Sequence, residues 1–467
     1  MAEPDLIYFV RTEIKMIQPE RIKTLNNKTL RDGKYVLYWM QAAQRTEYNH
    51  ALEYSIRRAN ELKKPVLVSF GITDNWPQAN LRHYYFMLEG LRKVKKDLWS
   101  KGIQMVIRHE SPNLSTIKLA KDATLVVVDA GQLRIQRKWR NNAAKKIDCP
   151  LYEVETNLIV PVEETSSKEN FSAGTFRPRI TKKLDYYLAP LKHKKPKLDS
   201  LGLKFAAFDI DDIDKAISKL NIDRSVGKVV SFHGGTRQAK RHLSLFLRNK
   251  LDSFAGLRND PNADCVSNMS PYFHFGQISP LYIALKVLET SSPGKNAYLE
   301  ELIVRRELSH NFVFYNNQYD KFASLPPWAE RTLNFHRRDK RQYLYSLEQF
   351  ETAETHDPYW NAAQKEMVIA GKMHGYMRMY WGKKILEWSK DPQTGFKTAL
   401  YLNNKYELDG RDPNAFAGVA WCFGKHDRAW AERPVFGKIR YMNSAGLKRK
   451  FDADAYVRKI QSLEKKP

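Results

Sequence analysis

The feature that most constrains the fold is a change of pattern about a third of the way along the chain. Before that point, short apolar runs alternate with longer stretches of helical periodicity, such as Glu47–Leu62 and Leu81–Lys101. Alternation of this kind predicts βαβ units, and therefore a largely parallel sheet with helices packed on it. The runs expected to form its strands are Val36–Met40, Pro65–Ile72, Ile103–Ile107, Thr124–Asp129 and Leu151–Glu155.

The rest of the chain, from about Leu203, has almost no strand pattern. Its clearest helical stretches are Ala239–Phe254, Asn296–Tyr315 and Thr355–Ser389, which are rich in aromatic residues and arginine. We therefore expect an N-terminal α/β domain and a larger all-α C-terminal domain, as a length of 467 residues allows. The predicted boundaries are 1–33 for an N-terminal extension, 34–156 for the α/β domain, 157–202 for an interdomain linker and 203–467 for the helical domain.

The charge of the chain indicates the kind of partner it binds. It holds 78 Lys and Arg against 52 Asp and Glu, a net charge of +26. Such an excess favours a nucleic acid, because basic side chains displace counterions from a phosphate backbone. A basic but otherwise ordinary protein is the alternative. We expect no membrane partner, because no apolar run approaches the roughly 18 residues that a span needs.

The cysteines and the N-terminus bear on the compartment. Cys149, Cys265 and Cys422 are scattered and show no zinc-binding spacing, so we expect a reducing compartment and no metal. The N-terminus has early acidic residues and no long apolar segment, which argues against a secretion signal. These features predict an intracellular protein and leave the cytoplasm, the nucleoid and the nucleus open.

Three tryptophans in the helical half allow two interpretations. Trp381 and Trp388 are seven residues apart, so they lie on one face of a helix, about 10 Å apart along its axis. Trp360 precedes them, on what we expect to be a neighbouring helix. The rings form either a tryptophan-rich core or a path along which an electron hops to a buried redox cofactor. Spacing leaves both open.

Three further segments carry polar groups in suggestive places. The run Ser267–Ser270 precedes Pro271 and a predicted helix, where hydroxyl and backbone N–H groups suit an anion. Glu301 and Arg305 stand four residues apart, as a surface ion pair does. The segment Tyr406–Trp421 is a polar turn between aromatic helices, and such turns often hold binding residues.

Taken together, several sequence blocks resemble the photolyase/cryptochrome superfamily, and within it the class II cyclobutane pyrimidine dimer (CPD) photolyases. The blocks follow the family order from about residue 34 to residue 455. They include Tyr38–Arg45, Thr175–Ile180, Leu257–Ser279, Glu300–Leu308, Thr355–Gln364, Gly371–Trp388, Tyr406–Gly418, His426–Trp430 and Gly437–Met442.

The resemblance implies a Rossmann-like α/β domain and a helical domain that binds FAD, active in its reduced form. It places Arg378 and Asp409 beside the flavin ring and Asn403 opposite flavin N5. It also assigns Trp381, Trp360 and Trp388 to an electron-transfer path, which favours the second interpretation of these rings. The adenine-phosphate cradle falls on Phe254, Val266, Ser267, Asn268, Met269 and Ser270.

The resemblance also implies a substrate, double-stranded DNA that contains a pyrimidine dimer, which the enzyme flips into its active site and splits by light-driven electron transfer. Glu301 stands where the family has the carboxylic acid that contacts the dimer. Arg305 replaces a tryptophan that packs on the dimer in some relatives. Further DNA-binding positions are Arg258, Met379 and Trp421 in the dimer pocket, and Trp430 and Arg440, which enter the space left by the flipped dimer.

Several questions stay open in the sequence. An antenna chromophore, a deazaflavin or a folate, or none, is compatible with the α/β domain. We expect a monomer. The main alternative function is a cryptochrome-like blue-light photoreceptor. A nucleotide-binding protein that uses only the α/β half, and a photolyase for (6-4) photoproducts, are weaker alternatives.

Overall fold

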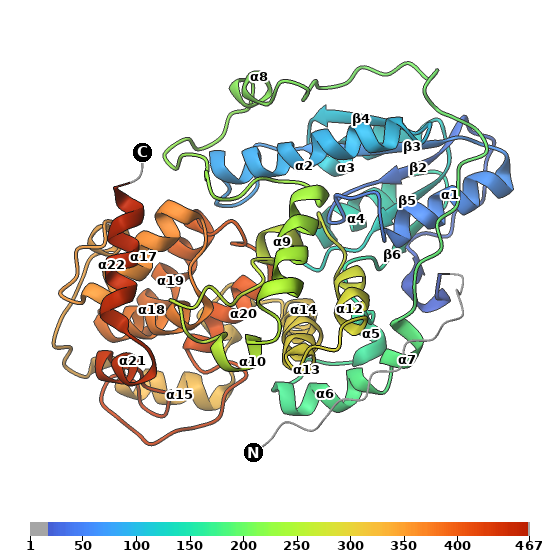
Figure 1. Cartoon of the computed structure of the whole chain (residues 1–467). Helices are drawn as coiled ribbons and strands as arrows, with labels where there is room; N and C mark the ends of the chain where they lie inside the picture. The colour runs from blue at the N-terminus through green and yellow to red at the C-terminus, as the bar shows by residue number, and fades with distance from the viewer. Residues whose placement is uncertain (1–16, 466–467) are drawn as a thin grey trace.

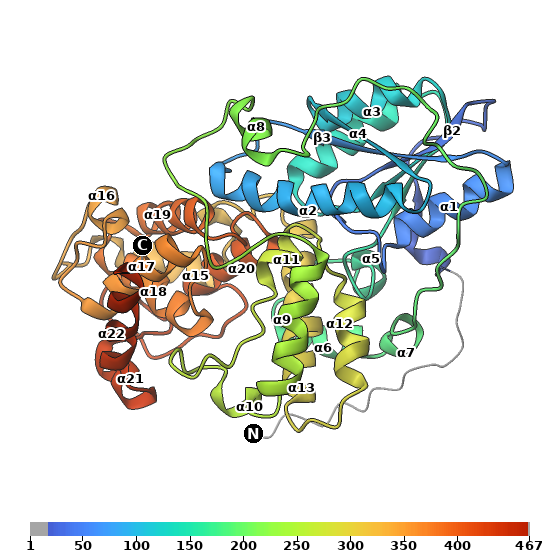
Figure 2. The same ribbon diagram turned by 45° about the horizontal axis from the view of Figure 1, so that its top comes forward.

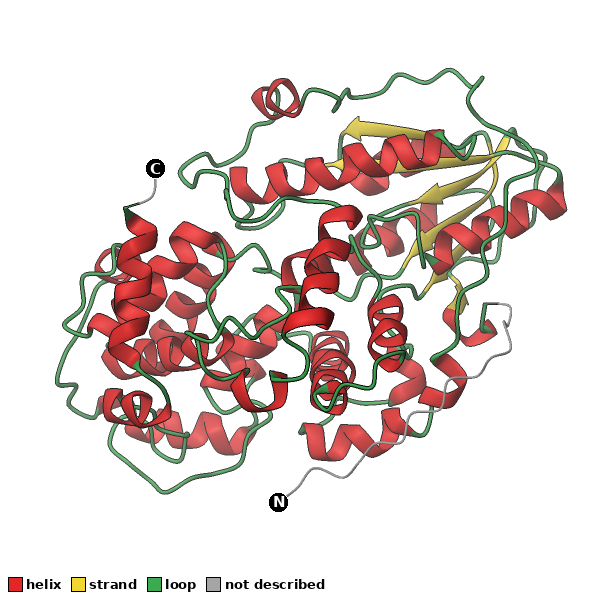
Figure 3. Ribbon diagram, in the orientation of Figure 1, coloured by secondary structure: helices red, strands yellow, loops and turns green. Residues whose placement is uncertain are grey.

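A computed structural model describes residues 17–465 and contains a six-stranded sheet beside a helical domain (Figure 1; Figure 3). The strand order is β1-β6-β5-β2-β3-β4, with every neighbouring pair parallel except β1 and β6. This confirms the predicted fold class. The strands are β1 (Ile22–Thr24), β2 (Tyr35–Trp39), β3 (Val66–Ile72), β4 (Gln104–His109), β5 (Ala123–Asp129) and β6 (Leu151–Val154).

The central strands are buried on both faces, which is why their sequences are nearly continuous apolar runs. Alternate residues of β2 enter different cores. Val36 and Tyr38 pack in one cluster with residues of α1 (His50–Leu62) and α2 (Leu81–Trp99). Tyr35 and Leu37 pack on the other face with residues of α3 and α4. The bounds of these last two helices are Pro112–Ala120 and Arg134–Lys146.

Strand β1 lies within the stretch expected to be an extension, and the sequence pattern did not predict it. Its three residues show no apolar alternation, and its pairing with β6 comes from backbone hydrogen bonds. The buried side chain of Arg21, just before β1, donates to the carbonyl oxygens of Leu158 at 3.0 Å and Ile159 at 2.6 Å. Residues 1–16 of that extension lie outside the described residues.

The packing of the linker and of the first residues of the predicted helical domain does not follow the predicted domain boundaries. Phe176 and Ile180 of α6 share a core with Leu299 of the helical domain. Ile213 and Ile217 of α8 instead pack in the core of the α/β domain, on the side of α2 (Figure 2). Apolar residues in a connecting segment pack on the nearest domain. The periodicity of the sequence does not reveal which domain that is. These segments hold α5 (Val162–Thr165), α6 (Ala173–Thr181), α7 (Leu184–Tyr187) and α8 (Ile213–Ser218).

The two longest helical stretches predicted in the C-terminal domain are each interrupted. The stretch Thr355–Ser389 divides at Gly371, whose φ of +67° ends α17 in the left-handed conformation that glycine tolerates best. The stretch Asn296–Tyr315 contains a π-helical segment, Glu300–Arg305, between α13 and α14. Such segments are rare and often occur at functional sites. Glu301 and Arg305 both lie in this one.

The helical domain lies beside the sheet (Figure 1), and α17 and α19 contact α2 directly, because Arg82 donates to the backbone carbonyls of Met367 and Tyr406. No described helix is long and apolar enough to cross a membrane. The helices are α9 (Thr236–Asn249), α10 (Phe254–Leu257), α11 (Ser270–His274), α12 (Pro280–Leu288), α13 (Lys295–Leu299), α14 (Arg306–Tyr315), α15 (Pro327–Phe335), α16 (Leu347–Glu351), α17 (Pro358–Ala370), α18 (Gly375–Trp388), α19 (Pro392–Tyr406), α20 (Pro413–Cys422), α21 (Ser444–Lys450) and α22 (Ala453–Glu464).

Candidate functional site

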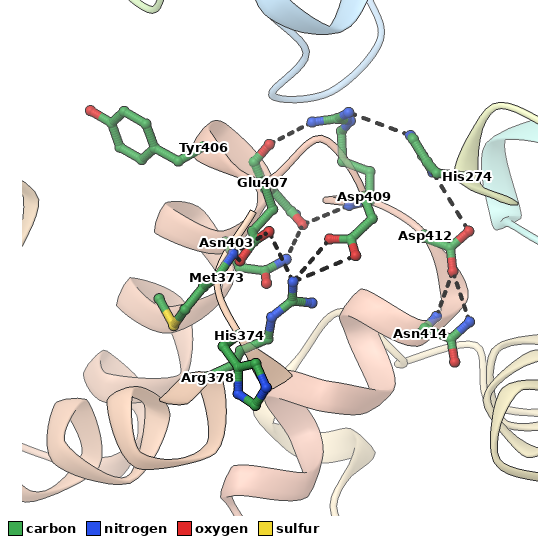
Figure 4. Close-up of polar contacts among 12 residues, drawn as sticks. His274, Met373, His374, Arg378, Asn403, Tyr406, Glu407, Asp409, Asp412 and Asn414 are labelled. Atoms are coloured by element: carbon green, nitrogen blue, oxygen red, sulfur yellow. Dashed lines mark hydrogen bonds and ion pairs between the residues drawn. The ribbon is translucent and has the colours of Figure 1, made fainter. Parts of the chain in front are cut away.

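An ion cluster around Arg378 forms the centre of the candidate site (Figure 4). Arg378 projects from α18 and reaches two carboxylates that follow α19. Its Nη2 atom lies 2.8 Å from Oε2 of Glu407 and 3.2 Å from Oδ1 of Asp409. The structure therefore brings the predicted pair together and adds Glu407, which also accepts a hydrogen bond from the backbone N–H of Met373. The sequence contained one sign of this third member, because Glu407 is an acidic residue only two positions before Asp409.

Burial and charge act against each other in this cluster. Burial raises the pKa of Glu407 to about 8, with Arg378 opposing the rise and Asp409 adding to it. Burial alone would lower the pKa of Arg378, but the carboxylates of Asp409 and Glu407 raise it above its ordinary value. Arg378 therefore stays charged, and its charge offsets part of the cost of burying the Glu407 carboxylate.

Polar atoms beside the cluster remain unpaired by the described chain. The Nε atom of Arg378 and the Nε2 atom of His374 are both buried without a hydrogen-bond partner. Burial lowers the pKa of His374 to about 3, so its ring is neutral. Asn403 is also buried, and its amide makes a long bond of 3.4 Å to the Asn404 side chain. Unpaired buried donors of this kind call for a polar group from outside the chain.

The predicted cradle is a loop that leads into α11. Phe254 and Met269 are buried in the core, and the ring of Phe254 packs 5.3 Å from that of Tyr298. Asn268 takes a left-handed backbone conformation with φ of +56°. The rest of the loop is half-buried and leaves polar groups accessible at Val266, Ser267, Asn268 and Ser270.

The three tryptophans form a buried stack in the order Trp381, Trp360, Trp388. The ring centroids of Trp381 and Trp360 are 6.4 Å apart and nearly parallel at 6°. Those of Trp360 and Trp388 are 6.2 Å apart at 67°. The Trp360 indole donates to the backbone carbonyl of Trp381, and the Trp381 indole donates to Gln364 at 2.9 Å. Trp381 follows Arg378 by one helical turn, so this end of the stack adjoins the ion cluster.

Two pairs among the residues predicted to line the dimer pocket include a member of the π-helical segment. The carboxylate of Glu301 lies 3.0 Å from Nη1 of Arg258, and both side chains are partly exposed. The guanidinium of Arg305 lies 5.5 Å from the centre of the Trp421 ring. Met379 is half-buried and its backbone carbonyl faces the thiol of Cys422, which follows Trp421. The structure thus pairs the predicted pocket residues Arg258 with Glu301 and Arg305 with Trp421.

Trp430 and Arg440 lie close together on an excursion of the chain, the loop of residues 423–443 between α20 and α21. The guanidinium of Arg440 lies 5.2 Å from the Trp430 ring centre, and that of Arg428 lies 4.7 Å from it. The Trp430 backbone N–H donates to the carbonyl of Lys438 at 2.9 Å. Arg428 was missed, although it stands two residues before Trp430. An exposed aromatic ring with two guanidiniums close to it is suited to contact bases and phosphates.

Known proteins resemble this chain along nearly its whole length. Residues 36–197 match the family model described as DNA photolyase. Over 450 residues the chain is 55% identical to the deoxyribodipyrimidine photo-lyase of Methanothermobacter thermautotrophicus, covering 96% of this chain and 99% of that protein. It is 40% identical to the deoxyribodipyrimidine photo-lyase of Arabidopsis thaliana, covering 96% and 94%.

The chain belongs to the DNA photolyase family. The predicted family is confirmed, and with it the prediction that the chain is an enzyme, a photo-lyase. Solved structures of photolyases and cryptochromes share the fold. A class III photolyase from Agrobacterium tumefaciens superimposes with a TM-score of 0.72 at 17% identity, covering 93% of this chain and 87% of that one. The Synechocystis cryptochrome gives 0.69 at 15% identity, covering 91% and 88%.

This photolyase fold also has a cavity between its two domains. The cavity lies at the carboxyl ends of the sheet strands, where Gln41 follows β2, and the helical domain contributes Arg306, His310 and Arg411 to its lining. The neighbours of β2 on either side belong to opposite halves of the sheet, and ligands of α/β sheets bind at such a switch point. Buried atoms without a partner in the described chain line it on Gln41, Gln44, Arg306, His310 and Arg411.

The cavity was not among the predicted sites. The sequence contained one sign of this cavity. Two polar residues, Gln41 and Gln44, closely follow the predicted strand that forms β2. Burial lowers the pKa of His310 to about 3, so its ring is neutral, and lowers that of Arg411 to about 9. The walls therefore combine a neutral ring, amides and guanidinium groups. Among residues 17–465, no cluster of His, Cys, Asp and Glu is placed to hold a metal ion.

Proposed function

We propose that the protein repairs cyclobutane pyrimidine dimers in DNA by light-driven electron transfer, with reduced FAD as cofactor. One observation carries the proposal: α18 joins the Arg378 ion cluster to the tryptophan stack within one helical turn. A redox cofactor at the cluster would therefore adjoin a path of oxidisable rings. Curated relatives at 55% and 40% identity are named deoxyribodipyrimidine photo-lyases, which supports the reaction.

The polar residues of the cluster suit a flavin. In the proposal, Arg378, Asp409 and Asn403 face the flavin ring, and the loop with Ser267 and Ser270 holds the adenine-phosphate part. The unpaired Nε atom of Arg378 is a donor that flavin could satisfy. Bound FAD, when reduced and excited, supplies the electron that opens the cyclobutane ring, and the protein supplies position and polarity. One solved neighbour, the Sulfolobus tokodaii photolyase, is described with two FAD molecules.

The dimer pocket in this proposal lies at the π-helical segment. In this proposal Glu301 contacts the dimer through its acidic proton and so steadies the extra negative charge that forms there, and Arg258 keeps the Glu301 side chain in place at 3.0 Å. Arg305 stands where some relatives have tryptophan. Its guanidinium lies over the half-buried Trp421 ring, and in this proposal Trp421 supplies the aromatic surface that packs on the dimer.

The DNA contacts fall on the excursion that carries Trp430. A dimer is poorly stacked, so flipping it out costs less than flipping a normal base. Trp430 and Arg440 then enter the space that the flipped dimer leaves. Exposed basic residues on and after the excursion contact phosphates. These contacts make DNA binding salt-dependent. In this proposal the protein acts on DNA as a monomer. The exposed basic residues are Arg428, Arg433, Lys438, Lys448, Arg449 and Lys450.

Illumination of the purified protein with duplex DNA that contains one dimer tests the function. We expect flavin absorption in the protein and restored pyrimidines under blue or near-UV light, with none in the dark. A protein that lacks flavin when purified and cannot be loaded with it, or DNA unchanged by light, contradicts the proposal. A cryptochrome-like photoreceptor is the alternative, since a cryptochrome shares the fold. That alternative predicts flavin absorption without repair.

The interdomain cavity is the proposed site of an antenna chromophore. Its amides, guanidinium groups and neutral His310 ring suit a polar aromatic molecule such as a deazaflavin or a folate. Replacing His310 by Phe would fill the polar wall with an apolar ring. We expect this variant to lose any second absorption band while it keeps the flavin band. Loss of both bands together, in a folded protein, contradicts the assignment of the cavity.

A further inference from the structure

The tryptophan stack ends inside the protein. Trp388, its last ring, is only 3% exposed, so an external reductant cannot reach it directly. Two other rings lie against it: the centroid of His356 is 4.9 Å from that of Trp388, and the centroid of Tyr345 is 5.7 Å away. Both residues precede α17 in the chain, and His356 is exposed. The stack therefore continues towards solvent through a histidine and a tyrosine.

Tyr345 and His356 share two hydrogen bonds. The backbone N–H of His356 donates to the phenolic oxygen of Tyr345 at 3.0 Å. The same oxygen lies 2.7 Å from Nδ1 of the His356 ring. Because the phenolic oxygen accepts the backbone bond, its one proton is free to point at Nδ1, which accepts when the neutral ring carries its proton on Nε2. The phenol is thus bonded directly to a base.

The backbone holds this pair in place against the stack. The backbone N–H of Tyr345 donates to the carbonyl of Trp388 at 3.2 Å. Tyr343 stacks on the outer side of His356, with centroids 3.7 Å apart, and is 37% exposed. The path from Trp388 to the surface is therefore fixed by backbone and ring contacts.

A fixed charge makes Trp388 a poor place for the positive charge to remain. The ammonium group of Lys384 is buried and lies 5.5 Å from the Trp388 ring centre. Glu387 pairs with this ammonium at 2.6 Å and offsets part of its field. A cation formed on Trp388 would still be repelled by Lys384 at short range. Moving the charge outward to a group that can release a proton removes this repulsion.

We propose that Tyr345 and His356 form the terminal redox pair of the tryptophan path, an inference that rests on the proposed function. An electron passes from Tyr345 to the oxidised Trp388 ring, which returns to its neutral state. The phenolic O–H bond breaks at the same time, and the proton binds Nδ1 of His356. The products are a neutral tyrosyl radical and an imidazolium. An external thiol then supplies one electron, the proton returns to the phenolate oxygen, and Tyr345 is restored.

Electron paramagnetic resonance tests this pair in the full-length, FAD-loaded protein, frozen immediately after illumination. We expect a tyrosyl signal that narrows when the protein is made with ring-deuterated tyrosine. Tyr345→Phe keeps the ring contact but removes the phenol, and should lower this signal at least tenfold. Tyr343→Phe is the matched control and should leave it unchanged. In heavy water, decay of the Trp388 radical should slow at least twofold in the wild type and not in Tyr345→Phe.

The outcomes separate this inference from the proposed function. Tryptophan radicals without any tyrosyl signal overturn the terminal pair and leave the stack intact. If no radical forms on any side chain, both the terminal pair and the electron-transfer role of the tryptophan stack are overturned. His356→Asn, which removes the ring base but keeps Tyr345, should lower the tyrosyl yield at least fivefold, and it serves as the second variant if Tyr345→Phe fails to fold. An unchanged yield in His356→Asn refutes the role of His356.

Discussion

Two groups of tryptophans in the helical domain differ in burial and in the groups that surround them. Trp360, Trp381 and Trp388 lie in the main core of that domain, packed ring to ring and almost without exposure. Trp430 lies on an excursion after α20, is 38% exposed and has the guanidiniums of Arg428 and Arg440 at 4.7 Å and 5.2 Å from its ring centre. An indole can pass an electron when its neighbours are rings at fixed distances, and it can contact DNA when it is accessible and surrounded by positive charge.

The comparison predicts that the two groups fail in different ways. Changes in the buried stack should alter stability and electron transfer but leave DNA recognition alone. Changes at Trp430 or Arg440 should alter DNA recognition and leave both other properties alone. Any variant that mixes these effects breaks the division.

The largest expected effect is on folding. Trp360→Ala removes a fully buried ring and should lower the free energy of unfolding by about 3–5 kcal/mol. Trp430→Ala removes an exposed ring and should change it by no more than about 0.5 kcal/mol. Denaturant unfolding of both variants checks the difference. Equal losses would mean that the exposed excursion is part of the core.

A smaller effect is expected on damage recognition. Arg440→Ala removes a cation that packs on Trp430, so the preference for dimer-containing over intact duplex should fall about tenfold, in line with a contact of ~1–2 kcal/mol. Arg449→Ala, an exposed basic residue of α21, is the control and should weaken binding to both DNAs equally. Titration of both duplexes at one salt concentration gives the ratio. A uniform loss in Arg440→Ala would count against its role in the space left by the dimer.

The smallest effect is expected at Glu301, which lies in neither tryptophan group. Glu301→Gln keeps a hydrogen-bond donor but removes the acidic proton, so repair per absorbed photon should fall roughly fivefold, equivalent to ~1 kcal/mol. Damage preference and photoreduction should stay at the wild-type level, because glutamine keeps the size of the side chain and a polar contact to the dimer, and the flavin and tryptophan sites are unchanged. Repair yield measured with pre-reduced enzyme decides the matter, and an unchanged yield removes Glu301 from the chemistry.

Much of the fold was predictable because its signals are local. Parallel strands buried on both faces leave continuous apolar runs, so β2, β3, β4, β5 and β6 were all expected close to their observed bounds. Strand β1 was not, because its pairing with β6 depends on backbone bonds to a distant segment. The π-helical turn at Glu300–Arg305 was missed for a similar reason: an extra residue in a helical turn leaves apolar periodicity nearly unchanged.

The family resemblance named residues that the structure brings together, such as Arg378 and Asp409, and their roles stay predictions. Other features of the site depend on three-dimensional packing. Trp360 lies between Trp381 and Trp388, an order that chain position does not suggest. Glu407 joins Arg378 because the turn after α19 folds back on α18. The interdomain cavity draws its walls from segments far apart in the chain, so only the packed domains reveal it.

The division between the two tryptophan groups is tested most directly by comparing Trp381→Phe with Trp430→Phe. Phenylalanine keeps much of the ring packing but is far harder to oxidise than an indole. The account predicts that Trp381→Phe loses photoreduction of bound FAD by external reductant, at least tenfold, yet repairs dimers normally when reduced beforehand and keeps its damage preference. Trp430→Phe should photoreduce at the wild-type rate and lose damage preference. Wild-type photoreduction in Trp381→Phe would contradict the account, because the stack would then be core packing alone.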